Sequence, residues 1–367
     1  MSAEAPLFAR VVAWQRRAGR QGLPWQGTRD PYRVWLSEIM LQQTQVATVL
    51  RYYERFVARF PSVEALAAAT LDDVLAAWSG LGYYRRARLL HAAAQVIVQQ
   101  LGGCWPTDWE GWRALPGVGD STAAAIAAFC YGQRVSILDG NVRRVLLRWW
   151  ARGPAPDRPI TARQLWARAQ ALLPASASAA EMAAYTQGMM DLGATVCTPR
   201  QPRCDACPLR SDCGAHASGT PEAWPQPAAR PLRQTQDWWL LLPVRGDGAW
   251  WLQRRAARGI WAGLWTPPLL QGPASAQVPR ECGALPAVAA LHERAVVTHA
   301  LTHRDLRLHR WVVEWAAAGD DAPALPGVQP DQGAWWSPSA ALALALPAPL
   351  RVWFQNELSD SRTSSSR

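Results

Sequence analysis

Four cysteines near the middle of the chain form its densest group of reactive side chains. Cys197, Cys204, Cys207 and Cys213 follow the spacing C-x6-C-x2-C-x5-C. Four thiolates this close in sequence can surround one soft-metal centre. Zinc and a four-iron, four-sulfur cluster both take four thiolate ligands, so the spacing leaves the metal open. The cysteine total of seven is odd, which indicates a metal site in a reducing compartment and not a disulfide framework.

Two carboxylates lie in sequence surroundings that could shift their pKa values and suit them to acid–base catalysis. Glu38 lies in the apolar helical stretch 35–41, where burial would raise its pKa and keep it protonated, as a general acid requires. Asp139 precedes Gly140 and Asn141 at a loop-to-helix junction. Taken alone, the position of Asp139 fits a helix cap as well as it fits catalysis.

A glycine pair marks a third candidate site. Gly117 and Gly119 lie in the segment 115–119, between two helical stretches. Glycine permits the positive φ angles and close backbone approach that a phosphate-binding turn needs, and the following helix would offer unpaired N–H groups to an anion. An ordinary helix–helix turn has the same residue types.

The elements that carry these groups are helical up to residue 214. Asp30 before Pro31 predicts one helix start, and Thr44 is expected to cap the next helix, which Pro61 ends. Apolar residues at helical spacing predict further helices around 63–77, 84–100, 122–129, 141–150, 162–172 and 181–191. We therefore expect an α domain over residues 1–214.

The second half of the chain changes character. Residues 215–236 are rich in Pro, Ala, Gly and Arg and are expected to form a linker. Short apolar or alternating runs predict strands at 238–244, 249–253 and 309–315, and helices are possible at 340–346 and 349–358. This predicts an α+β domain over 237–356, followed by a Ser-rich tail at 357–367 that we expect to be disordered.

Charge and composition limit the classes of binding partner that the chain can have. The chain has 38 basic and 28 acidic residues, a net charge of +10, and the larger share of the excess falls in residues 1–225. This favours a polyanion partner for the first domain. All 38 basic residues are arginine, so no lysine amine is available for a Schiff base. There is no apolar run long enough to cross a bilayer and no secretory leader, so we expect a cytoplasmic protein with no membrane partner.

These motifs together resemble the MutY-type adenine DNA glycosylases. The resemblance runs from about residue 13 to 213, through the segments 31–46, 80–84, 115–123, 137–142, 189–193 and the four cysteines. It implies a helix-hairpin-helix glycosylase domain, with a six-helix part at about 30–136 and a cluster part formed by 1–29 and 137–214. It also implies that the cysteines hold a 4Fe-4S cluster, and that the partner is double-stranded DNA with adenine opposite 8-oxoguanine or guanine.

The same resemblance gives roles to single residues. Gln43 and Tyr83 would enter the base stack, and the hairpin from Gly117 to Gly119 would grip a phosphate. A target base must be flipped out of the duplex for excision. Glu38 would then protonate the adenine at N7.

The remaining catalytic roles also come from the resemblance. Asp139, ionised, would stabilise the positive sugar, in the manner of glycoside hydrolysis, and Asn141 would orient Asp139. Bifunctional relatives have a lysine after the hairpin, where this chain has Ser121. The sequence therefore predicts a monofunctional enzyme that leaves an abasic site.

The second domain is similar to the MutT-like domain of the same family. The segment 299–303 matches the stretch that reads the oxidised guanine, with Thr302 and His303 as the candidate contacts and Leu301 where a Phe is usual. The Nudix hydrolase signature is absent, which favours recognition over nucleotide hydrolysis.

Three alternatives differ in function. An endonuclease III-like enzyme for oxidised pyrimidines conflicts with the missing lysine and with the pair Gln42 and Gln43. A thymine or pyrimidine mismatch glycosylase is closer, since Ser121 is compatible with it. A non-catalytic iron–sulfur DNA-binding sensor would not need both Glu38 and Asp139. Nothing in the sequence indicates an obligate dimer, so we expect a monomer.

Overall fold

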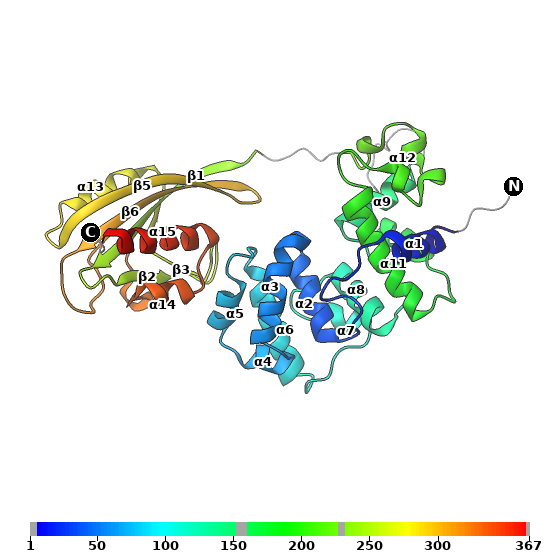
Figure 1. Ribbon diagram of the computed structural model, residues 1–367, viewed down its shortest axis with the longest axis horizontal. Helices are drawn as coiled ribbons and strands as arrows, with labels where there is room; N and C mark the ends of the chain where they lie inside the picture. Colours follow the sequence, from blue (N-terminus) through cyan, green and yellow to red (C-terminus); the bar gives the residue numbers. More distant parts are fainter. Residues whose placement is uncertain (1–5, 152–159, 227–231, 365–367) are drawn as a thin grey trace. The chain divides into compact units, whose positions relative to one another are not determined.

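A computed structural model describes residues 6–151, 160–226 and 232–364 of the chain (Figure 1). They divide into two units, one formed by residues 1–68 and 89–229 and the other by 69–88 and 230–367. The sequence predicted that 69–88 belong to the first domain, whereas these residues pack with the C-terminal half. Among the described residues, no helix is both long and apolar enough to span a membrane.

The first unit is helical. Its helices are α1 (Leu7–Ala18), α2 (Pro31–Leu41), α3 (Val46–Arg59), α4 (Val63–Ala68), α6 (Arg85–Gln99), α7 (Trp109–Arg113), α8 (Asp120–Tyr131), α9 (Gly140–Trp149), α10 (Ala162–Ala171), α11 (Ala179–Asp191) and α12 (Gly214–Ala217). Short helical turns follow at Leu192–Val196, Cys204–Ala206, Arg210–Asp212 and Pro221–Ala223. The pattern confirms the predicted α fold of this part of the chain.

Helix α8 lies at the centre of this unit. It packs against α2, α7 and α11, and its residues from Thr122 to Ala128 are all buried. Most of these residues are alanines, and small side chains let neighbouring helix backbones approach closely. The packing fixes α2, which carries Glu38, against the helix that follows the glycine hairpin.

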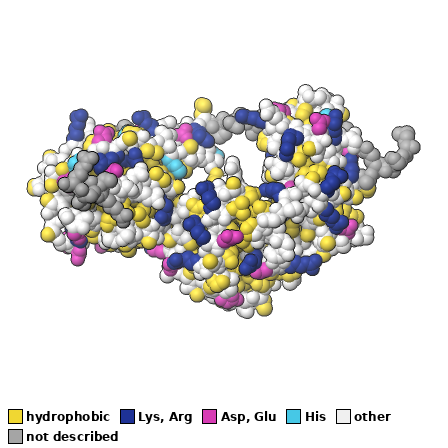
Figure 2. Space-filling view, viewed as in Figure 1, with side chains coloured by type: hydrophobic (Ala, Val, Ile, Leu, Met, Phe, Trp, Pro, Cys, Tyr) yellow, Lys and Arg dark blue, Asp and Glu magenta, His cyan; other side chains and the backbone are white. Residues whose placement is uncertain are grey.

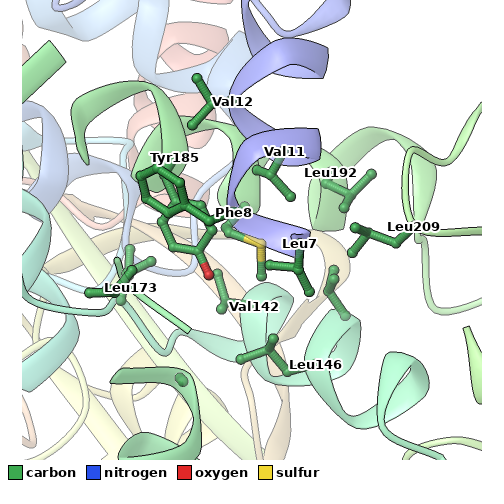
Figure 3. Close-up of a cluster of buried hydrophobic side chains, with 14 of the residues drawn as sticks. Leu7, Phe8, Val11, Val12, Val142, Leu146, Leu173, Tyr185, Leu192 and Leu209 are labelled. Atoms are coloured by element: carbon green, nitrogen blue, oxygen red, sulfur yellow. The ribbon is translucent and has the colours of Figure 1, made fainter. Parts of the chain in front are cut away.

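Helix α1 returns to pack on α11 and α9, far along the chain (Figure 3). Phe8 stacks on Tyr185 with ring centroids 4.8 Å apart, and Val11 faces Gly188. A Cβ at Gly188 would lie 2.8 Å from Val11 Cγ1, so the glycine permits the close approach of the two helices. The N-terminus and residues 179–196 therefore share one core.

The second unit contains one mixed sheet. Its strands are β1 (Gln234–Arg245), β2 (Trp250–Arg254), β3 (Trp265–Thr266), β4 (Leu269–Gln271), β5 (Val288–Ala300), β6 (Arg304–Trp315) and β7 (Gly333–Trp336). The order is β3-β2-β1-β6-β5, with β4 paired to β1 and β7 paired to β2. Strands β1 and β6 are parallel, and the remaining pairs are antiparallel. The helices are α5 (Leu71–Trp78), α13 (Val278–Gly283), α14 (Pro338–Ala343) and α15 (Ala348–Ser364).

Helices cover both faces of this sheet. Cys282 of α13 packs with Leu241 on one face, and Phe354 of α15 packs on Trp250 on the other, with ring centroids 5.1 Å apart. Side chains alternate between the two faces of a strand, so β1 and β6 are buried on both sides where helices cover them. This explains the continuous apolar run in β1, from Trp238 to Val244.

Two predicted features differ from the structure, and the long strand β5 was not predicted. The expected helix at 63–77 is split into α4 and α5, because the Thr70 hydroxyl accepts the Asp73 amide at 3.1 Å and starts a new helix. Gln45, not Thr44, precedes α3. Strand β5 was missed because most of its residues are exposed or half-buried, which leaves no apolar period to detect.

The tail and the linker also differ from expectation. We expected disorder over 357–367, but α15 continues to Ser364, and residues 365–367 lie outside the described residues. The Glu357 carboxylate holds this helix through Arg294, at 2.6 Å, and through the Trp353 indole N–H, at 2.8 Å. Strand β1 begins at Gln234, inside the predicted linker, because it pairs with β6 from Arg304 onward.

The α1–α11 contact gives a stability prediction. Gly188→Ala should lower the free energy of unfolding by about 1–3 kcal/mol, since overpacking outweighs the better helix propensity of alanine. Gly246→Ala is the control, because a Cβ there meets no atom within 4 Å. Urea unfolding followed by circular dichroism measures both variants. Equal stability of Gly188→Ala and wild type would contradict the packing argument.

Candidate active site and cysteine-lined cavity

Glu38 is held in a protonated state by its surroundings. It lies on α2, most of whose residues are buried. Burial raises the pKa of Glu38 to about 8, and the nearby negative charge of Asp139 adds to the shift. A carboxylic acid with this pKa keeps its proton at neutral pH and can donate it to a bound base.

Asp139 both caps a helix and completes a carboxyl pair. Its Oδ1 accepts the Val142 amide N–H at 2.7 Å, which makes it the N-cap of α9. Burial raises the pKa of Asp139, while hydrogen bonds from the amides of Val142 and Asn141 and the charge of Arg144 oppose that rise. Because these donors favour the ionised form of Asp139, the pair carries its negative charge on Asp139 and its proton on Glu38. The alternatives of cap and carboxylate site are therefore compatible.

Asn141 belongs to a hydrogen-bonded link that runs from α9 towards the cysteines. Arg144 Nη2 donates to Asn141 Oδ1 at 2.9 Å and to the Gly193 carbonyl at 2.6 Å. Arg144 Nε donates to the Cys197 carbonyl at 2.8 Å. Arg144 was not predicted from the sequence, where its only signal is its position one turn after Asn141.

A cavity of about 380 Å³ opens beside Glu38. Its wall includes Trp25, Gln26 and Arg29 from the loop before α2, and Gln187 from α11. This volume lies within the usual range of small-molecule sites, about 300–1,000 Å³. An aromatic ring, amide groups and a protonated carboxyl group together suit a flat, hydrogen-bonding base. The loop residues were not identified from the sequence, because their role depends on the return of the N-terminus to α11.

Asp191 anchors this loop. Its side chain is fully buried and accepts the backbone N–H of Arg20 at 2.8 Å and the Arg20 Nε–H at 2.6 Å. Gln187 Nε2 also donates to Asp191, at 2.8 Å. Gln26 Nε2 donates to the Arg20 carbonyl at 3.1 Å, so the anchor extends to the cavity wall.

The glycine hairpin has the backbone expected of a tight turn. Gly117 has a φ of 78°, and a Cβ there would lie 2.6 Å from the Leu89 Cβ, so only glycine fits. Gly119 is the N-cap of α8, where a Cβ would meet no atom within 4 Å. Open space and unpaired first-turn amides suit the approach of an anion. Ser121 follows in the first turn of α8 and is half-buried.

Gln43 and Tyr83, the two predicted base-stack residues, share an unusual backbone. Both have positive φ, at 54° and 47°, which is uncommon for residues other than glycine. Strained positions of this kind cluster at functional sites. Gln43 belongs to the first unit, where its neighbour Gln42 donates to the Thr122 hydroxyl at 3.2 Å. Tyr83 belongs to the second unit, and 47 % of it is exposed.

Thr302 and His303 lie in the exposed turn between β5 and β6. Three residues earlier, the half-buried His299 lies 5.9 Å from the ring of Trp261. Trp261 has a φ of 56° and is almost fully buried. The predicted recognition residues are thus accessible at one end of a long hairpin.

All four cysteines line one small cavity of about 30 Å³, together with Arg148 and His216. Arg148 is buried and donates to the carbonyls of Thr198, at 2.7 Å, and Pro199, at 3.0 Å. Its Nη1 also lies 3.4 Å from Cys197 Sγ. Burial raises the pKa of Cys204, Cys207 and Cys213, and at Cys204 the positive charge of Arg148 opposes that rise.

The four cysteines lie around one shared space. Among the described residues, no group of three or more His, Cys, Asp or Glu side chains is close enough to hold one metal ion. The thiols instead surround a shared cavity, and in a four-iron cluster each thiolate binds a different iron.

Arginine side chains dominate the charged atoms on the visible face of the helical unit (Figure 2). The half-buried Arg144 and the buried Arg148 both donate to backbone carbonyls. A basic helical surface around a cavity is consistent with phosphate contact.

Comparisons with known proteins agree with this geometry. Residues 36–171 match the HhH-GPD superfamily of base excision DNA repair proteins, and residues 239–356 match the NUDIX domain. A thermostable thymine-DNA glycosylase has a similar solved structure, with a TM-score of 0.52 and 26 % sequence identity over 57 % of this chain and 95 % of that one. The chain is therefore a helix-hairpin-helix base excision repair glycosylase with a C-terminal Nudix-like domain.

Sequence relatives define the family more narrowly. The adenine DNA glycosylase of Buchnera aphidicola (subsp. Acyrthosiphon pisum) is 36 % identical over 265 residues, which cover 71 % of this chain and 74 % of the relative. The adenine DNA glycosylase of Mycobacterium tuberculosis is 43 % identical over 216 residues, 59 % of this chain and 69 % of the relative. The chain belongs to the adenine DNA glycosylase family.

The raised pKa of Glu38 predicts a pH-dependent stability. Folded Glu38 holds its proton up to about pH 8, whereas the unfolded chain releases it near the ordinary value of 4.5. The folded state binds more protons in this window, so the free energy of unfolding should fall as pH rises from about 4.5 to 8. Glu38→Gln should remove this component of the slope. Urea unfolding across the pH range measures it, with the exposed Glu54→Gln as control. The same slope in wild type and Glu38→Gln would refute the assignment.

Proposed function

We propose that this chain hydrolyses the N-glycosidic bond of adenine opposite 8-oxoguanine or guanine in duplex DNA. The observation that supports this most directly is the carboxyl pair, in which Glu38 lines the cavity and holds the proton while Asp139 carries the charge. Both groups come from one chain, so a monomer can carry the activity. The family supports adenine as the excised base.

The reaction follows from the charges on the pair. Adenine is a poor leaving group until it is protonated, and the Glu38 carboxyl would give its proton to N7 of the flipped base. The bond from C1′ to N9 then breaks, and the electron pair leaves with the neutral adenine. Asp139 stabilises the positive sugar, water adds at C1′, and the released proton returns to Glu38. Asn141, held by Arg144, keeps Asp139 oriented.

We further propose that the product keeps its strands intact. A strand-cleaving glycosylase uses an amine to form an imine with the sugar. The sequence has no lysine, and Ser121 stands where the bifunctional relatives carry one. The abasic site should therefore persist after excision.

Residues of both units would contact DNA. Gln43 and Tyr83 would enter the base stack, and the amides at Gly117 and Gly119 would hold a phosphate. Thr302 and His303 would contact the base opposite adenine, and the accessibility of their turn supports this role. In this proposal residues 1–214 excise the base and residues 237–356 inspect its partner, joined through 215–236.

A 4Fe-4S cluster is proposed at Cys197, Cys204, Cys207 and Cys213. When bound, the cluster would tie residues 197–213 into a rigid loop whose arginines contact phosphate. Arg148 would hold the loop through its hydrogen bonds to the carbonyls of Thr198 and Pro199.

The excision reaction gives the principal test. Under single turnover with a duplex carrying adenine opposite 8-oxoguanine, strand breaks should occur only after alkali and only at the adenine. Glu38→Gln should lower the rate constant by about 10²–10⁴-fold while binding is retained, because only the proton donor is lost. The matched control Glu54→Gln should keep the wild-type rate.

A second mismatch substrate distinguishes the proposed adenine glycosylase from the nearest alternative, a thymine mismatch glycosylase. A thymine-DNA glycosylase is a structural relative, so a duplex with thymine opposite guanine is tested in parallel. Release of thymine and not adenine would overturn the substrate assignment. Strand breaks before alkali, with the enzyme trapped by borohydride through a side chain, would overturn the monofunctional assignment. Binding without any base release would favour a DNA-bound sensor.

The cluster proposal predicts metal content. Protein purified without oxygen should hold about four iron and four acid-labile sulfide per chain. Cys204→Ser should lose most of the iron, while Cys104→Ser, at an exposed position outside the group, should keep it. One zinc per chain and no iron would contradict the cluster.

A further inference from the structure

The segment that carries Tyr83 is bound tightly within the second unit. Residues 69–88 pack with residues 230–367. The Ser79 hydroxyl donates to the Leu346 carbonyl at 2.7 Å, and the Tyr84 hydroxyl donates to the same oxygen at 3.0 Å. Leu346 is fully buried, so both lone pairs of its carbonyl are used inside the protein.

Arg351 of α15 also binds this segment, through Ser79. Its Nε and Nη2 donate to Ser79 Oγ at 3.2 and 3.0 Å. The same guanidinium donates to the carbonyls of Leu342, at 2.7 Å, and Leu344, at 3.0 Å. Ser79 is therefore both a donor to the C-terminal half and an acceptor from it. We call Leu346 and Arg351, with their hydrogen bonds to Ser79 and Tyr84, the brace.

Further contacts hold the flanks of the same segment. Asp72 of α5 forms an ion pair with Arg254 at the end of β2. Beyond the turn, Arg88 Nη1 donates to the Ala257 carbonyl at 3.1 Å. The segment is thus fixed on both sides of Tyr83 by residues of the Nudix-like domain.

The turn itself needs such support. Gly80 and Gly82 have φ of 99° and 75°, and Tyr83 between the second glycine and α6 has a φ of 47°. Two glycines allow many backbone states, and a left-handed tyrosine is unfavourable unless its surroundings hold it. The Arg86 guanidinium lies 5.4 Å from the Tyr83 ring centre and donates to the Gly82 carbonyl at 3.2 Å.

We propose that the Nudix-like domain positions Tyr83 through the brace, so that this domain sets the geometry of the residue that enters the base stack. Ser79, Tyr84 and Arg351 are positioning residues in this proposal. A side chain that is already fixed loses less conformational entropy on binding DNA. The inference rests on the proposed function, because it assigns the effect to Tyr83 on DNA.

A double-mutant cycle in the full-length chain tests the proposal. Ser79→Ala/Tyr84→Phe removes both hydroxyls of the brace, and Tyr83→Ala removes the inserted side chain. The probe is a duplex with 2′-fluoro-2′-deoxyadenosine, which resists excision, opposite 8-oxoguanine, and the measurement is its Kd. The brace variant should bind about tenfold more weakly. The triple variant should bind no more weakly than Tyr83→Ala alone, because residues that act through one side chain are not additive.

Control variants distinguish an effect on the position of Tyr83 from a general loss of folded structure. Tyr52→Phe and Ser339→Ala carry the same chemical changes at positions outside the brace and should bind as wild type. Thermal unfolding identifies any variant that does not fold, and the milder Tyr84→Phe then replaces the double change, with a smaller loss of affinity expected. Amide hydrogen exchange should increase at residues 79–86 in the brace variant.

The outcomes are distinguishable. Unchanged affinity of the brace variant, with Tyr83→Ala weakened, would overturn this inference and leave the proposed function intact. Losses that multiply in the triple variant would also overturn it. No effect of Tyr83→Ala would overturn both the DNA role of Tyr83 and the inference, while base excision would still test the proposed function separately.

Discussion

The first unit depends on keeping one proton between two half-buried carboxyl groups, Glu38 on α2 and Asp139 at the start of α9. Desolvation and the negative charge of Asp139 raise the pKa of Glu38 to about 8, so Glu38 keeps its proton near neutral pH. The backbone amides of Val142 and Asn141 donate to Asp139, and these hydrogen bonds favour its ionised form. The packing of α2 on α8, and of α1 on α11, holds the cavity wall around the protonated partner. Acid chemistry at neutral pH follows from this asymmetry.

Helix α9 joins the carboxylate to the cysteines. Its first residue follows Asp139, and its later turns carry Arg144 and Arg148, whose guanidinium groups bind the backbone around Cys197. Any movement of the cysteine loop therefore acts on the helix that Asp139 caps. The hydrogen bonds of Arg144 and Arg148 thus connect the backbone around Cys197 with the helix that Asp139 caps.

The second unit also includes the segment that bears Tyr83. Its sheet is covered by α13 on one face and α15 on the other, and α15 also supplies Arg351. The same helix thus stabilises the sheet and contacts the segment that bears Tyr83. One helix serves both tasks because Arg351 and Phe354 lie within one turn of each other on it.

The sequence by itself determined the chemistry-bearing residues, the helical first half and the Nudix-like second half. Cysteine spacing, the apolar setting of Glu38 and the glycine hairpin are local signals. They involve residues close in sequence, so they can be recognised without knowing the fold. Tertiary structure alone decided that residues 25–29 line the cavity and that 69–88 pack with the C-terminal half. Strand β5 and the end of α15 also required it, because their partners are distant in sequence and their exposed residues show no period. Contacts between residues far apart in the chain leave no trace in local composition, since each partner is compatible with many others until packing selects one.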